Sequence, residues 1–208
     1  KLSDARIVLL GAGAANSTIA RLLITDGADP ANISLFDRKG GLHRGRQDLE
    51  RDPMAYRQWE LATTTNPQRF DRPQDALAGA DALIALSSPG PDTVQAAWVS
   101  SMAKKAIVFA CANPVPEIWP HTAKEAGAFI VATGRGDFPN QVNNSVCFPG
   151  ILKGALLCRA SAISDGMAIA CAHSLSRYAQ DRPLGIRPDS IMPQMEDDGL
   201  FPRQAADV

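Results

Sequence analysis

The sequence predicts an α/β fold: a doubly wound, mostly parallel sheet with helices on both faces and a helical C-terminal extension. Short apolar runs rich in β-branched residues alternate with segments whose apolar residues recur at helical spacing. Glycine ends both the first apolar run and the first helical segment. Such a repeating order of strand and helix builds a parallel sheet whose crossover helices cover both faces.

The first unit of this pattern extends from Arg6 to Asp37. A buried strand is expected at Ile7–Leu10, a helix follows until Gly27, and a second strand at Ile33–Phe36 ends in an acidic residue. This order of strand, glycine loop, helix, strand and terminal acid is typical of a Rossmann-type dinucleotide site.

The loop of this unit reads Gly-Ala-Gly-Ala-Ala-Asn. Gly11 permits the tight turn, Gly13 lets the backbone approach a pyrophosphate, and the helix N-terminus attracts that anion. Asn16 stands where a small residue normally allows close packing of helix and strand, so the match to the fingerprint is weaker at this position. The alternative is a glycine turn without a ligand. We predict these cofactor-binding residues: Gly11, Gly13, Ala14, Ala15, Asn16 and Asp37.

A basic loop follows Asp37, from Arg38 to Arg46. One interpretation is a solvated loop with glycine turns. The other is that Arg38 or Lys39 lies near the adenosine ribose and contacts a 2′-phosphate, which favours NADP. The carboxylate of Asp37 repels such a phosphate, so we expect NAD as the cofactor, with NADP as the open alternative.

Three further strands are expected at 82–86, 106–112 and 128–133, with helices at 52–65, 74–77, 93–104 and 122–126 between or before them. Ser87 and Ser88 follow the first of these strands and Asn113 follows the second. Open α/β sheets bind ligands at the carboxyl ends of their strands, so we expect Ser87 and Ser88 to contact the cofactor.

The pattern changes after the last expected strand. Residues 134–144 are polar and lack periodicity, as expected of a functional loop. Helices are expected at 149–160 and 164–178, followed by a proline-rich and acidic tail. We therefore predict a dinucleotide-binding domain at residues 1–179 and an arm at 180–208.

Composition limits the class of partner. Charged residues make up 21% of the chain and the formal net charge is −1, which does not indicate a nucleic-acid-binding surface. No apolar run approaches the roughly 18 residues of a membrane-spanning helix. The four cysteines show no metal-binding spacing, so we expect a reduced, cytoplasmic protein. The chain lacks an initiator Met, and we expect it to be part of something longer.

Several stretches together resemble the malic enzymes, specifically their C-terminal NAD(P)-binding domain. The resemblance covers nearly the whole chain and implies oxidative decarboxylation of malate to pyruvate and CO₂, with reduction of NAD(P) and a requirement for Mg or Mn. The matching stretches are Gly11 to Ala15 with Asp37 and Lys39-Gly40, Phe109 to Glu117, Gly127 to Arg135, Asp137 to Asn144 and Phe148 to Gly150.

The resemblance also implies roles for three asparagines. Asn113 matches the family asparagine that contacts cofactor and substrate, and Asn144, with Asn143 beside it, matches the one that reaches the nicotinamide amide or the malate carboxylate. We therefore predict Asn113, Asn143 and Asn144 as substrate-binding residues. Read alone, each is a common turn residue.

The lysine, tyrosine and acidic metal ligands of malic enzymes belong to a segment that precedes this one, and we find none of their motifs here. We therefore predict no catalytic or metal-binding residue in this chain, an N-terminal catalytic domain as its partner, and a homo-oligomer. Two alternatives stay open: a malolactic-type enzyme domain, and a non-catalytic NAD-binding module.

Overall fold

The computed structural model describes residues 1–208, which divide into two compact units, Lys1–Phe138 and Pro139–Val208. The division at Phe138 differs from the boundary expected at residue 179, because the last three helices pack with one another and form a unit of their own.

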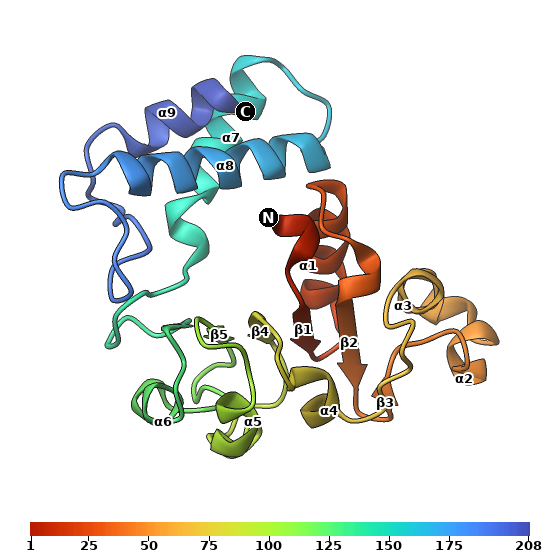
Figure 1. The fold of residues 1–208 in the computed structure, drawn as a ribbon. Helices are drawn as coiled ribbons and strands as arrows, with labels where there is room; N and C mark the ends of the chain where they lie inside the picture. The colour runs from red at the N-terminus through yellow and green to blue at the C-terminus, as the bar shows by residue number, and fades with distance from the viewer. The chain divides into compact units, whose positions relative to one another are not determined.

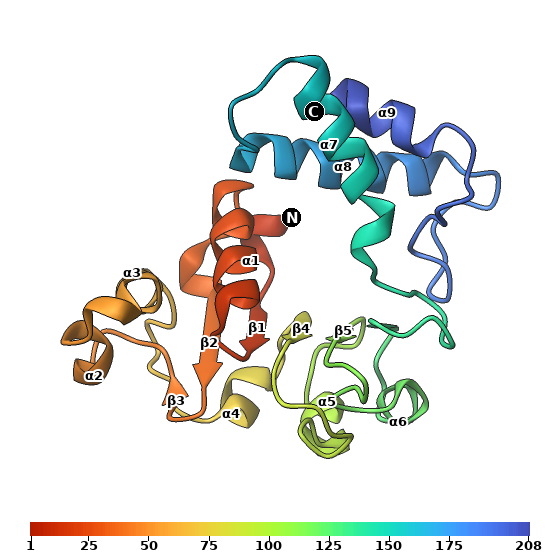
Figure 2. The ribbon, with the colours of Figure 1, turned by 180° about the vertical axis from the view of Figure 1, so that it is seen from behind.

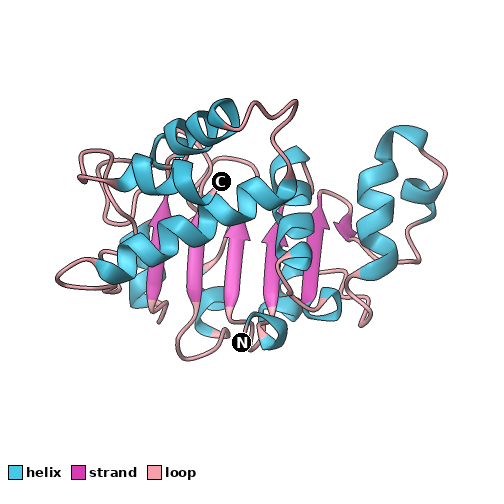
Figure 3. Ribbon diagram, turned by 90° about the horizontal axis from the view of Figure 1, so that it is seen from above, coloured by secondary structure: helices cyan, strands magenta, loops and turns pink.

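The first unit contains one sheet of six strands in the order β3-β2-β1-β4-β5-β6, seen as a row in Figure 3. All neighbours pair in parallel except the short antiparallel β3 beside β2. β1 therefore lies between β2 and β4, and the order of the strands reverses there, as in Rossmann-type sheets. The strands are β1 Ile7–Leu10, β2 Ile33–Asp37, β3 Gly40–Gly41, β4 Ala82–Ala85, β5 Ile107–Ala110 and β6 Ile130–Thr133.

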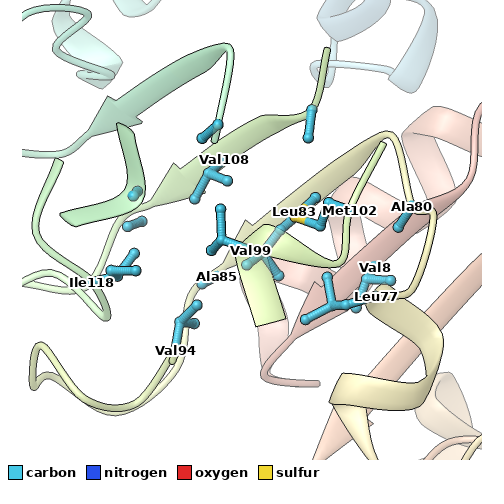
Figure 4. Packing of buried hydrophobic residues seen from close by; sticks show 14 of the residues in the cluster. Val8, Leu77, Ala80, Leu83, Ala85, Val94, Val99, Met102, Val108 and Ile118 are labelled. Carbon is cyan, nitrogen blue, oxygen red and sulfur yellow. The ribbon is translucent and has the colours of Figure 1, made fainter. Parts of the chain in front are cut away.

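The two faces of the sheet carry two separate hydrophobic clusters, since alternate residues of a strand point to opposite faces. Ile7 and Leu9 pack with residues of helices α1 and α3. Val8 packs on the other face with residues of α4, α5 and α6, and Figure 4 shows Val8, Leu83 and Val108 pointing into this second cluster. The expected doubly wound α/β fold with helices on both faces is confirmed.

Residues with known capping preferences stand at the starts of helices in this unit. Gly13 is the N-cap of α1, and the Asp52 side chain accepts a hydrogen bond from the Met54 amide at the start of a 3₁₀ turn that leads into α3. The helices are α1 Ala14–Thr25, α2 Gln47–Glu50, α3 Tyr56–Thr64, α4 Pro73–Leu77, α5 Ala96–Ser100 and α6 Pro120–Glu125, with 3₁₀ turns η1 Leu2–Asp4, η2 Pro30–Asn32 and η3 Pro53–Ala55.

The helix expected at 93–104 is shorter in the structure, where α5 spans only Ala96–Ser100. The amide of Val94 donates to the carbonyl oxygen of Glu117 at 2.9 Å instead of entering a helical ladder. Residues before Ala96 therefore belong to the loop that follows β4.

The second unit is a group of three helices that lie side by side in Figures 1 and 2. They are α7 Phe148–Leu157, α8 Asp165–Asp181 and α9 Leu200–Asp207, preceded by the 3₁₀ turn η4 Asn144–Val146. A Cβ added at Gly150 would lie 2.3 Å from Gln204 Oε1, so glycine allows α7 and α9 to approach closely. The Gln204 amide donates to the Val146 carbonyl at 2.8 Å.

The tail from residue 180 was expected to be an arm or a partner-contacting segment, and its last part forms the helix α9. Leu200 and Gln204 of α9 are fully buried. This short amphipathic helix packs on α7 and α8. The sequence did not indicate it, because proline and acidic residues precede it. None of the helices combines the length and the apolar character needed to cross a bilayer.

Candidate functional site

A cleft of about 630 Å³ opens at the carboxyl ends of the central strands. It lies where β2 and β4 flank β1, which is the position at which open α/β sheets bind ligands. The cleft brings together six of the predicted cofactor residues: Gly11, Gly13, Asp37, Arg38, Ser87 and Ser88.

The two glycines of the loop differ in what surrounds them. Gly11 has a φ of +96°, and a Cβ there would lie 2.3 Å from the carbonyl oxygen of Leu86. Gly13 has an ordinary φ of −75°, and a Cβ there would meet no protein atom within 4 Å. Gly11 is therefore required by the close approach of β1 and β4, whereas the space in front of Gly13 is free for a ligand.

The N-terminus of α1 faces this space with free backbone donors. The first α-helical bond of the helix runs from the Ser17 amide to the Gly13 carbonyl at 3.0 Å, so the amides of Ala14, Ala15 and Asn16 have no intrahelical partner. No side chain caps the helix and no acidic residue occupies its first turn. These donors and the positive end of the helix dipole fit a pyrophosphate.

Asn16, where the sequence departs from the fingerprint, holds the helix to the central strands through its side chain. Its side chain is 1% exposed, and Nδ2 donates to the carbonyl oxygens of Leu10 at 2.9 Å and Gly11 at 2.8 Å. A longer bond of 3.3 Å reaches Ile84 on β4. The amide thus ties α1 to both central strands, while its Oδ1 is buried without a partner.

A helix outside the glycine motif also supports the loop. The amide of Gln58, on α3, donates to the Ala12 carbonyl at 3.3 Å, and the Ser17 hydroxyl donates to the same oxygen at 3.4 Å. No sequence pattern indicated a role for Gln58, since its partner lies 46 positions away.

Asp37 is paired with an arginine that the sequence did not single out. Arg46 Nη2 donates to Asp37 Oδ2 at 2.7 Å and Nη1 donates to Oδ1 at 3.1 Å. Arg46 also donates to both oxygens of Asp48, which accepts a third bond from Lys39 Nζ at 2.9 Å. Arg46 is only 11% exposed, so the interpretation of this loop as merely solvated is wrong at this residue, although Arg38 is exposed.

The pKa values in this cluster follow from its hydrogen bonds. Bonds to Asp48 and then to Asp37 raise the pKa of Arg46, and bonds from Arg46 and then Lys39 lower the pKa of Asp48. Arg46 and Asp48 are therefore charged at neutral pH, and their ion pair lies at the centre of the cluster.

Ser87 and the residues around Asn113 are connected by a buried carboxylate. Glu117 Oε1 accepts from the Ser87 amide at 2.8 Å and the Ser87 hydroxyl at 3.2 Å, while Oε2 accepts from the Ala112 amide at 3.0 Å. Burial, and then the charge of Glu117, raise the pKa of Cys111 to about 11. The sequence analysis placed Glu117 within a matching motif but assigned it no role.

The three predicted asparagines fall into different units. Asn113 is exposed after β5, and a Cβ at Gly134 would lie 3.2 Å from its Nδ2. Asn143 and Asn144 are exposed residues of the second unit, and Asn143 Oδ1 accepts from the Ser145 amide at 3.1 Å. Only Asn113 belongs to the unit that holds the cleft. No group of three or more His, Cys, Asp or Glu side chains is arranged to hold a metal ion.

The sheet order, the cleft at its reversal point and the open helix N-terminus define a dinucleotide-binding α/β domain of Rossmann type. A family model described as "Malic enzyme, NAD binding domain" matches residues 1–198. The chain therefore belongs to the malic enzyme family, and it is similar to the NAD-binding domain of that family.

Known proteins support this assignment along the whole chain. An NADP-dependent malic enzyme of Halomonas elongata is 42% identical over 181 residues, which are 86% of this chain and 40% of that protein. A bifunctional malic/malolactic enzyme of Bacillus subtilis is 40% identical over 208 residues, which are 100% of this chain and 48% of that protein. The crystal structure of the Entamoeba histolytica malic enzyme has 57% sequence identity and a TM-score of 0.96, and the match covers 100% of this chain and 42% of that one.

This chain thus spans less than half the length of the curated relatives it matches. The expected family, fold and type of cofactor, NAD or NADP, are confirmed by these similarities. The individual contacts to the cofactor and to a substrate stay predictions.

Proposed function

We propose that this chain is the NAD(P)-binding part of an enzyme that oxidatively decarboxylates malate to pyruvate and CO₂ while it reduces NAD(P). The observation that supports this most directly is the cleft between β2 and β4, onto which the uncapped N-terminus of α1 opens. Bound NAD(P) supplies the acceptor for a hydride, and the residues of this chain bind and orient it.

The cleft offers a separate group for each part of the dinucleotide. Backbone amides at Ala14 and Ala15 would hold the pyrophosphate, and Asp37 would accept hydrogen bonds from the ribose hydroxyls, with Arg38 beside it. Ser87 and Ser88 would form the opposite wall. Asn113 would serve the nicotinamide end, where a neutral amide can both donate and accept hydrogen bonds.

The substrate end of the proposal rests on groups outside this chain. A catalytic domain that carries a lysine, a tyrosine and the ligands of Mg or Mn would bind malate, and Asn143 and Asn144 would contribute from this side. We expect the chain alone to bind NAD(P) without converting malate, and the protein joined to such a domain to form NAD(P)H when malate is added.

A second candidate is a malolactic-type reaction, in which malate yields lactate and CO₂ without net release of reduced cofactor. The Bacillus subtilis relative is a bifunctional malic/malolactic enzyme, which supports this second candidate. Chromatography of the products of the longer protein separates the two, because pyruvate accompanies NAD(P)H in one case and lactate appears in the other.

The proposal includes a homo-oligomer in the cytoplasm. Phe148, Leu152 and Leu156 lie at helical spacing on α7 and are 58%, 37% and 77% exposed, which supports a contact with another chain. A single mass in light scattering that equals one chain at all concentrations would contradict this part of the proposal.

Calorimetric titration of NAD and NADP tests the central claim. The chain should bind at least one of them, and Gly13→Val should abolish binding, because the added side chain fills the open space in front of the loop. Ala97→Val, an exposed change on α5, is the matched control and should bind as the original chain does. If the original chain binds neither dinucleotide, the proposed function is wrong.

A further inference from the structure

Glu117 is the one charged side chain among the buried residues of the chain, with an exposed fraction of 0%. No lysine, arginine or histidine forms an ion pair with it, and its three hydrogen bonds come from Ser87 and Ala112. Burying a carboxylate without a cation costs several kcal/mol unless hydrogen bonds satisfy it. A buried carboxylate without a cation is therefore expected to have a role that an apolar side chain cannot fill, such as accepting hydrogen bonds from several donors at once.

The carboxylate joins the ends of two neighbouring parallel strands. One oxygen holds Ser87, just after β4, and the other holds Ala112, just after β5 and directly before Asn113. The partners lie 30 and 5 positions away in the sequence. Because bonds to an ionised acceptor are stronger than neutral ones, this one group fixes both strand ends relative to each other.

Glu117 also holds the far end of the loop that follows β4. Its backbone carbonyl accepts from the Val94 amide at 2.9 Å, so the loop is fastened to the same residue at Ser87 and at Val94. Between these two points lie Ser88, Pro89 and Thr93, which line the cleft. This wall of the cleft is therefore a loop, Ser87 to Val94, whose two ends are both hydrogen-bonded to Glu117.

The core prevents Glu117 itself from moving. Ile118, the next residue, is fully buried, and Val94 is 1% exposed in the same hydrophobic cluster, where Figure 4 shows both side chains. The position of the carboxylate is thus set by the packing beneath the sheet, and the loops take their positions from the carboxylate.

We propose that Glu117 is a positioning residue for the cofactor: it holds the Ser87–Thr93 wall and the Ala112–Asn113 segment in the arrangement that receives the dinucleotide. Glu117 does not line the cleft and acts through Ser87 and Ala112. This inference rests on the proposed NAD(P)-binding function, since its effect is an effect on cofactor affinity.

Glu117→Gln tests the role of the charge at nearly constant shape. A glutamine offers one carbonyl oxygen and two donors, so one of the amides at Ser87 and Ala112 would face a donor and lose its acceptor. We expect the dissociation constant for the dinucleotide to rise roughly 10- to 100-fold, the equivalent of one hydrogen bond to a charged group. Amide hydrogen exchange at Ser87 or Ala112 should accelerate by a similar factor, while Val108, inside β5, exchanges as before.

Glu125→Gln is the matched control, since it removes the same charge from an exposed position on α6. It should leave both the affinity and the exchange rates unchanged. A role confined to stability would lower the midpoint of thermal unfolding of Glu117→Gln but would leave the dissociation constant and the local exchange rates, measured well below that midpoint, as in the original chain. That pattern would overturn the inference.

The original chain supplies a second measurement in case the variant does not fold. Without cofactor, the amides of Ser87 and Ala112 should exchange slowly and their proton resonances should lie downfield, as expected of donors to a carboxylate. Exchange as fast as that of exposed loop amides would contradict the inference. Failure of the original chain to bind NAD or NADP would instead refute the proposed function.

Discussion

Gly11 and Gly13 stand two positions apart in one motif, and the structure predicts that replacing them has opposite consequences. A methyl group at Gly11 would lie 2.3 Å from the Leu86 carbonyl oxygen and 3.0 Å from its carbon, and both are backbone atoms that cannot rotate away. The β1–β4 pairing continues here, with the Leu86 amide donating to Leu10 at 3.0 Å. Gly11→Ala must therefore push apart the two central strands.

The size of the effect follows from two costs. A left-handed φ of +96° costs a residue with a Cβ about 1–2 kcal/mol, and overpacking in a tight region costs about 1–3 kcal/mol more. The free energy of unfolding should fall by roughly 2–5 kcal/mol, which lowers the midpoint of thermal unfolding by roughly 5–15 °C for a unit of this size.

Gly13→Ala is the internal comparison. Its φ of −75° is open to alanine, and no protein atom lies within 4 Å of the added Cβ. Alanine is a poorer N-cap than glycine, but it also reduces the entropy of the unfolded chain, and the two effects of about 0.5–1 kcal/mol nearly cancel. We expect unchanged stability together with at least a tenfold loss of NAD affinity.

Tryptophan fluorescence during thermal or urea unfolding measures this comparison cleanly. All three tryptophans, Trp59, Trp98 and Trp119, lie in the first unit, so their emission reports on the unit that holds the loop. Calorimetric titration of NAD completes the assay. The reasoning is refuted if Gly11→Ala is as stable as the original chain, or if Gly13→Ala loses the same stability as Gly11→Ala.

Three further predictions concern charge and reactivity. Asp37→Ser should raise the affinity for NADP relative to NAD and Arg46→Ala should lower it, because the first change leaves the cluster of Asp37, Lys39, Arg46 and Asp48 with one excess cation and the second leaves it with one excess carboxylate; competitive titrations check both. Hydrogen bonds, chiefly from Arg46, lower the pKa of Asp48 in the folded state, so the stabilisation from this group is present above about pH 4 and is lost as the pH falls below it. The urea midpoint should drop less steeply in this acid range for Asp48→Asn. Because burial and a nearby carboxylate raise the pKa of Cys111 to about 11, iodoacetamide at pH 8 should modify the exposed Cys158 before Cys111, as peptide mass spectrometry would show.

The order of the main strands and helices of the first unit could be predicted from the sequence because most of these elements have a local signal. Ile7–Leu10 is a short apolar run stopped by glycine, and the structure places β1 at those residues. The two-residue strand β3 and the helix α9 gave no such signal. Gly40–Gly41 pairs only because its backbone meets β2, and α9 is stabilised by contacts with helices far earlier in the chain.

The residues of the candidate site also divide into those that could be predicted from the sequence and those that could not. Residues that follow a strand, such as Ser87, could be predicted because the topology of a parallel sheet gathers strand ends at one edge. Glu117, Arg46 and Gln58 could not, since each acts on partners that only the folded chain brings near. A glutamate in a proline-rich stretch and an arginine in a basic loop look like surface residues until their burial is known.

The paired state of Asp37 changes what an acidic residue at this position means for cofactor choice. Such a residue usually indicates NAD, because its charge repels a 2′-phosphate. Here Arg46 and Lys39 balance Asp37 and Asp48, so the cluster carries no net charge, and the exposed Arg38 beside the cleft adds a positive one. Asp37 Oδ1 already accepts from the Lys39 amide and from Arg46, whereas Oδ2 accepts only from Arg46. Oδ2 therefore keeps a lone pair that would accept from a ribose hydroxyl in the proposed binding mode, and this end of the cleft would then bind NAD by hydrogen bonding without repelling NADP by charge.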